Sequence, residues 1–108
     1  MHIKKRTSPH HVYARFEIAP DVASPKVKGV RTGYSPHHKF AKVDYLASGF
    51  HVYPDDEFHF PGETLEIKIT FPSWSELRKN VRVGDRFDVL ELDRVIGRGT
   101  IERSNEGV

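Results

Sequence analysis

The 108 residues amount to one domain, because folding a chain of this length buries about two thirds of its surface and supports a single hydrophobic core. The sequence contains no cysteine, which excludes a disulfide framework, a thiol nucleophile and a thiolate metal site and fits a reducing compartment. No apolar run approaches the roughly 18–20 residues that a membrane-spanning helix needs. We therefore predict a cytoplasmic protein without a membrane partner.

The formal net charge of +2 is unevenly distributed along the chain. Residues 1–40 hold eight Lys and Arg against two acidic residues, whereas residues 41–108 hold nine against thirteen. This asymmetry indicates either a basic surface for phosphate or an acidic protein, or only a solvated tail beside an ordinary domain. The candidate basic surface, with tyrosines interleaved as in many RNA-binding proteins, comprises Lys4, Lys5, Arg6, Tyr13, Arg15, Lys26, Lys28, Arg31 and Tyr34.

The first half of the chain predicts strands, because proline and glycine divide it into short runs. Residues 12–18 alternate apolar and polar side chains, which is typical of a strand buried on one face. A second strand is expected over 39–46, with Phe40, Val43 and Tyr45 buried, and a weaker one over 50–53.

The second half predicts more strands and very little helix. Residues 64–71 alternate again, and 95–101 form a last strand. The alternation that begins at Arg86 changes phase at Leu90, which indicates a bulge. Only residues 73–79 have helical character, for a turn or two. Five to seven strands with even turn spacing indicate an all-β sandwich or a small barrel.

Motifs for catalysis are missing from the sequence. No phosphate-binding loop ending in Gly-Lys-Ser/Thr occurs, and no serine lies in a G-x-S-x-G context. His51 and His59 are candidates for a metal site together with a carboxylate from 55–57, and the alternative is a solvated acidic turn. We expect no enzyme, catalytic residue, metal or cofactor. A small enzyme at 55–57 would require a concave pocket there.

Three motifs, in order, resemble the third (C-terminal) domain of translation elongation factor Tu. The first is Gly33-Tyr34-Ser35-Pro36 followed by Phe40, and the second is Pro61-Gly62-Glu63 before an alternating strand. The third spans residues 83–101 and shares with the family Gly84, Arg86, Phe87, Glu91, Arg94, Gly97 and Gly99. The resemblance implies an all-β fold, a closed six-stranded antiparallel barrel over 10–103, between a basic tail at 1–9 and a short tail at 104–108.

The resemblance also implies a non-catalytic binding function, since the GTPase domain of that family is absent from this chain. In the family this barrel holds the T stem of tRNA and contacts protein partners, which carries over to positions near His37, Glu91 and Leu92. We predict a module that binds the translation machinery or tRNA/RNA. The alternative is a protein-interaction module, a regulator or immunity-type protein, that competes with elongation factor Tu for a protein partner.

Trp74 supports two interpretations at this stage. It is either an exposed aromatic anchor for a partner or a plug over one end of the barrel. The candidate residues for binding nucleic acid or a partner are His37, His38, Arg31, Tyr34, Glu91, Leu92, Arg94 and Trp74.

Overall fold

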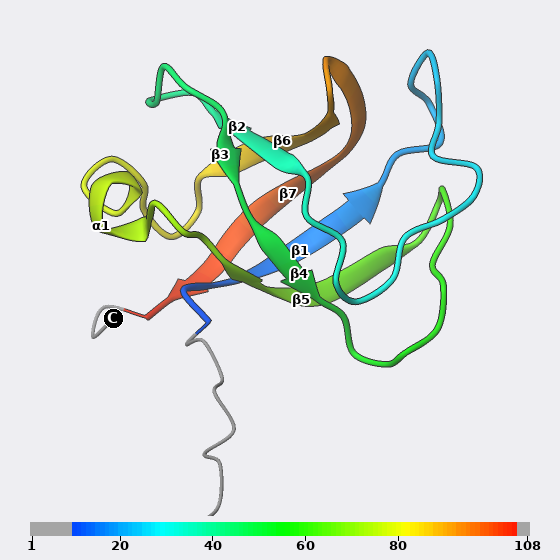
Figure 1. The fold of residues 1–108 in the computed structure, drawn as a ribbon, viewed down its shortest axis with the longest axis horizontal. Helices are drawn as coiled ribbons and strands as arrows, with labels where there is room; N and C mark the ends of the chain where they lie inside the picture. Colours follow the sequence, from blue (N-terminus) through cyan, green and yellow to red (C-terminus); the bar gives the residue numbers. More distant parts are fainter. Residues whose placement is uncertain (1–9, 106–108) are drawn as a thin grey trace, which may run out of the picture.

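Antiparallel strands account for nearly all the regular structure in the computed structural model, which describes residues 10–105 (Figure 1). The elements in this part of the chain are β1 (Val12–Ile18), β2 (His37–Phe40), β3 (Ala47–Ser48), β4 (Phe50–Val52), β5 (Thr64–Thr70), α1 (Trp74–Leu77), β6 (Arg86–Glu91) and β7 (Arg94–Ser104). The helix has four residues, too few to cross a bilayer.

The strands form one seven-stranded sheet in the order β3-β2-β6-β7-β1-β5-β4. Its two edge strands, β3 and β4, follow each other along the chain and are separated only by Gly49. One continuous segment therefore pairs with β2 on one side and with β5 on the other, and it nearly closes the sheet into a barrel. The expectation of six strands differs from the seven observed because this segment divides into two short strands.

Gly49 allows this division because the backbone passes close to the core at this point. A Cβ atom on Gly49 would lie 2.6 Å from the His38 ring and 2.9 Å from the side chains of Ile69 and Phe71. The Gly49 N–H donates to the carbonyl oxygen of Pro36 at 3.1 Å. A larger residue has no room here, so the closing segment depends on glycine.

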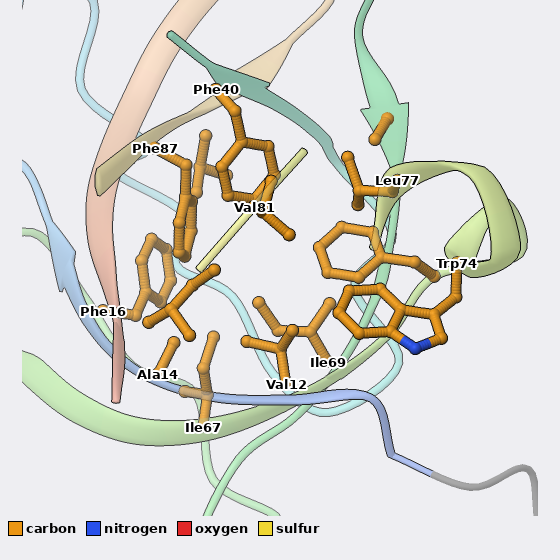
Figure 2. Close-up of a cluster of buried hydrophobic side chains, with 14 of the residues drawn as sticks. Val12, Ala14, Phe16, Phe40, Ile67, Ile69, Trp74, Leu77, Val81 and Phe87 are labelled. Atoms are coloured by element: carbon orange, nitrogen blue, oxygen red, sulfur yellow. The ribbon is translucent and has the colours of Figure 1, made fainter. Parts of the chain in front are cut away.

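The predicted period-2 pattern is confirmed in β1 and β5. The apolar side chains of β1 point into the barrel, and those of β5 meet them from the neighbouring strand (Figure 2). The interior is filled by aliphatic and aromatic side chains, the largest of which include Phe16, Phe40, Phe71, Ile67, Ile69, Leu77 and Ile96. Burial of this apolar surface is the main stabilising term of the fold.

The strand predicted over 39–46 is wrong in its extent. Strand β2 ends at Phe40, and residues 41–46 form the turn to β3. Phe40 and Val43 are buried as expected, but Tyr45 lies on the surface. The Val43 N–H donates to the Phe40 carbonyl at 3.2 Å, so the chain folds back at once. Apolar residues three apart fit such a turn better than a strand, whose period is two.

The change of phase predicted in β6 is confirmed, since the β6–β7 register shifts between Val89 and Leu90. The helical segment is confirmed as a single turn. Its Trp74 side chain lies against the apolar core in Figure 2 and is only 5% exposed. It also stacks on His11, with ring centroids 5.2 Å apart. Trp74 therefore packs against the core as a plug, and the interpretation of Trp74 as an exposed anchor does not hold in this structure.

Candidate partner-binding site

Three connecting segments gather at one end of the barrel, opposite α1: residues 19–36, residues 54–63 and the β6–β7 hairpin at 91–94 (Figure 1). We call this region the loop end. Connecting segments held on a rigid sheet are where binding residues are most often found. The loop end also contains most of the residues that the sequence singled out.

A carboxylate at the end of β6 ties the hairpin to the first loop. Glu91 Oε2 accepts hydrogen bonds from Lys26 Nζ at 2.8 Å and from the Tyr34 hydroxyl at 3.2 Å. Its Oε1 accepts from Arg94 Nη2 at 2.7 Å, and Arg94 Nη1 donates to Ser24 Oγ at 3.3 Å. One side chain thus connects parts of the chain up to 65 residues apart.

The electrostatics of this cluster favour an ionised Glu91. Partial burial opposes ionisation, but the hydrogen bond and positive charge of Lys26, with the Tyr34 hydroxyl and Arg94, hold the pKa of Glu91 below its usual range. Burial and the adjacent Glu91 carboxylate raise the pKa of Tyr34, so this phenol stays a hydrogen-bond donor. The cluster is therefore a charged anchor with little tendency to titrate near neutral pH.

Replacing Glu91 with glutamine is expected to loosen the first loop and to lower the free energy of unfolding by about 1–2 kcal/mol, because charge-assisted hydrogen bonds are lost in a partly buried site. Urea unfolding at pH 7 measures the change. Glu76→Gln is the matched control, since its pair with Lys79 is long (3.8 Å) and exposed, and its loss is worth little. Equal effects of the two substitutions would contradict the assigned role of Glu91.

A histidine between two carboxylates ties the second loop together. His59 Nδ1 donates to Glu63 Oε1 at 2.8 Å, and His59 Nε2 donates to Asp55 Oδ1 at 2.7 Å. The hydrogen bond to Glu63, and then the bond and charge of Asp55, raise the pKa of His59 despite its burial. Val30 and His59 also exchange two backbone hydrogen bonds of 2.8 Å, which join the second loop to the first.

This arrangement corrects the metal-site hypothesis. His51 lies in the core, whereas His59 uses both ring nitrogens for the carboxylates of its own loop. In the part of the chain that the structure describes, no group of three or more His, Asp or Glu side chains is placed to hold a metal ion. Residues 55–57 form an exposed acidic turn, as the alternative interpretation proposed.

The loop end also exposes large apolar side chains. Arg31 places its guanidinium 4.9 Å from the ring centroid of Phe58, and the Phe58 and Phe60 rings lie 6.5 Å apart. Four large apolar side chains of the loop end are between 45% and 82% exposed: Val27, Phe58, Phe60 and Leu92. Large apolar side chains left exposed on cross-linked loops favour an interaction surface.

The structure brings five of the eight candidate residues to the loop end. Tyr34, Glu91 and Arg94 share the charged cluster, Leu92 lies at the hairpin tip, and Arg31 lies on the first loop. His37, partly exposed on β2, pairs with Leu90 close to the hairpin.

The other two candidates do not contribute to this surface. His38 is fully buried because neighbouring residues of a strand face opposite sides, and Trp74, the first residue of α1, is buried against the core. The basic tail predicted over 1–9 lies outside the described residues.

A buried polar chain inside the barrel was not predicted from the sequence. The Tyr53 hydroxyl donates to His51 Nδ1 at 2.8 Å, His51 Nε2 donates to His38 Nε2 at 2.8 Å, and His38 Nδ1 donates to the Ala47 carbonyl at 2.9 Å. This order of donors requires both imidazoles to be neutral. Burial lowers the pKa of His38 to about 4 and that of His51 well below its ordinary value, which agrees with the hydrogen-bond pattern.

A scan against protein-family models found no match for this chain, and a search of curated proteins found none. The all-β, nearly closed antiparallel barrel therefore rests on the residues and contacts described above. Any function must likewise be argued from the geometry and charge of the loop end.

Proposed function

We propose that this chain is a non-catalytic module that binds a protein partner through its loop end. The observation that carries the proposal is the combination of rigid loops and exposed apolar side chains. The Glu91 cluster and the His59 bridge hold three loops together, yet Val27, Phe58 and Leu92 remain substantially exposed. Loops already fixed in place lose little entropy on binding, so a pre-organised apolar surface favours tight association.

The charge of the loop end favours a protein over RNA as the partner. Residues 19–36, 54–63 and 91–94 contain seven carboxylates against four Lys and Arg side chains. Nucleic-acid binding depends on cations that neutralise phosphates, and a surface with an excess of carboxylates repels the phosphates. A protein surface with apolar and basic side chains fits the loop end better.

RNA binding is the second candidate, and one specific observation favours it. A shallow hollow of about 550 Å³ lies on the outer face of β1, β6 and β7 and contains three arginines, Arg15, Arg86 and Arg98. However, Arg15 pairs with Glu102 at 3.1 Å, and Arg98 lies 3.3–3.4 Å from two carboxylates. Two of the three cations are thus already neutralised, which leaves a weak site for phosphate.

The resemblance to the third domain of elongation factor Tu belongs to this proposal. The residues that carry the resemblance include Tyr34, Glu91 and Arg94, which meet in the charged cluster of the loop end. We propose accordingly that the partner belongs to the translation machinery, or that the module competes with elongation factor Tu for one of its protein partners.

The test is affinity capture from a lysate of the source cells with the full chain and two variants. Phe58→Ser removes an aromatic side chain from the loop end, and Phe50→Ser is the matched control, because Phe50 on β4 is similarly exposed (43% against 48%). We expect a discrete protein that survives ribonuclease treatment and is retained by the unmodified chain and by Phe50→Ser, but not by Phe58→Ser. Retention of RNA alone, or equal retention by all three forms, would contradict the proposal.

A further inference from the structure

The β6–β7 hairpin carries a leucine where the backbone favours glycine. Glu91 and Arg94 form its last residue pair, so Leu92 and Asp93 are the two residues of the loop. Leu92 has a φ of 59°, and it is the only non-glycine residue with a positive φ in the described part of the chain. In two-residue hairpin loops a positive φ at the first position is normally supplied by glycine, because a Cβ atom there is sterically strained.

The same side chain is also the most exposed large apolar group at the loop end. Leu92 is 82% exposed, so its isobutyl group gains almost nothing from packing within the domain. The backbone strain of Leu92 therefore lowers the stability of the isolated domain without any compensating burial, and glycine would remove that strain. Strained residues of this kind are concentrated at binding and catalytic sites, where the surroundings hold them in place.

The surroundings of Leu92 are rigid. Its neighbour Glu91 is held by Lys26, Tyr34 and Arg94, so the base of the hairpin cannot swing freely. Because Val27 follows Lys26 directly, the Lys26–Glu91 ion pair also brings a second exposed aliphatic residue to this part of the loop end. The tip is thus a fixed apolar projection.

The charges beside the tip indicate the chemistry of what it contacts. Asp93 is exposed next to Leu92, and no side-chain partner is described for it. The two cations at the base of the hairpin, Lys26 and Arg94, are already bound to Glu91. A complementary surface therefore needs an apolar pocket for the leucine and a basic side chain for the aspartate.

We propose that Leu92 is the anchor of the interface: it inserts into an apolar pocket on the protein partner, and Lys or Arg side chains at the rim of that pocket pair with Asp93. This inference rests on the proposed function, since it names the contact residue of the same surface. The strain and exposure of Leu92 in the free domain are then compensated when the complex forms.

The experiment compares stability and binding in one set of variants. Leu92→Gly is expected to raise the urea midpoint of unfolding, because glycine adopts a positive φ without strain and the leucine side chain contributes almost no buried surface. The same substitution is expected to weaken binding of the purified protein retained in the capture experiment by at least about 30-fold in Kd. Leu92→Met keeps an apolar side chain and is expected to stay within about threefold, as is Val83→Gly, which truncates an exposed apolar residue outside the loop end.

The outcomes separate this inference from the proposed function. If Phe58→Ser abolishes binding but Leu92→Gly stays within about threefold, the loop end binds a protein and the anchor role of Leu92 is wrong. If Leu92→Gly destabilises the fold, the leucine has a structural role and the inference is also overturned. Leu92-dependent binding to vesicles of phosphatidylcholine and phosphatidylglycerol would assign the tip to a lipid surface and overturn it as well. If no protein is retained at all, both proposals fail.

Discussion

Lowering the pH from 7 to 5 is expected to reduce the free energy of unfolding by about 2 kcal/mol through His38 alone. His38 has an ordinary pKa of 6.5 when unfolded and a pKa of about 4 inside the barrel. Between these values the unfolded chain binds more protons than the folded chain, so stability is lost as the pH falls. His51 shifts in the same direction and adds to the loss.

The cause is the closed hydrogen-bond chain from Tyr53 to Ala47. His38 and His51 already share the single proton between their Nε2 atoms, so an added proton places two donors against each other at 2.8 Å. Burial penalises the resulting charge, and no carboxylate bonds to either ring in the described structure. Urea unfolding across this pH range measures the effect.

A triple variant, His38→Leu, His51→Leu and Tyr53→Phe, removes every side chain of this hydrogen-bond series. Comparing its unfolding with that of the wild type is the decisive test. The stability of the variant is expected not to fall between pH 7 and 5, because the two buried imidazoles that bind protons only in the unfolded chain have been removed. His59 is retained in both proteins and acts in the opposite direction to His38 and His51. The pKa of His59 is raised, so its contribution is present below pH 6.5 and is lost as the pH rises through the folded value. A wild-type stability that is flat over this range would refute the prediction.

Gly97→Ala is expected to destabilise the protein by about 3 kcal/mol through crowding between β1 and β7. A Cβ atom at this position would lie 2.5 Å from the Glu17 carbonyl oxygen and 2.6 Å from the Phe16 ring. The carbonyl belongs to backbone paired within the barrel wall, so it cannot move aside without disturbing the sheet. Overpacking of this kind forces either a backbone shift or a strained rotamer.

The control for Gly97→Ala is Asp88→Ala on the adjacent strand. Asp88 pairs with Arg98 in the β6–β7 register, but its side chain is exposed, so its replacement is expected to change stability by less than about 0.5 kcal/mol. Both variants are compared by thermal and urea unfolding. If Gly97→Ala were as stable as Asp88→Ala, the close approach of β1 and β7 would be more adaptable than this structure indicates.

The sequence predicted long strands well and short ones poorly. Strands β1 and β5 have seven residues each, enough for the alternation to stand out from chance. Strand β3 has two residues and carries no periodic signal. The strand expected over 39–46 is wrong beyond Phe40, because burial of both Phe40 and Val43, three residues apart, fits a turn and not the period of a strand.

The candidate site was predicted in part. Tyr34, Glu91, Leu92 and Arg94 were named from a resemblance, and they do lie together, but their contacts with Lys26 and Ser24 were not predictable. The His59 bridge has a local signal, since a carboxylate lies four residues before His59 and another four residues after it. This spacing alone does not show that both side chains turn toward the imidazole. The exposure of Phe58 and Phe60 likewise needed the folded loops.

The amino-acid sequence by itself determined that this chain is an all-β domain with one core, because the alternation of apolar and polar residues and the frequent glycines and prolines act over only a few residues. Tertiary structure alone decided which loops meet, which histidines are buried and which apolar side chains stay in solvent. These properties depend on residues such as Lys26 and Glu91, which are 65 positions apart and become neighbours only when the barrel closes. Local sequence patterns do not predict a contact of this kind, because the pairing of all the strands in the sheet determines which loops lie next to each other.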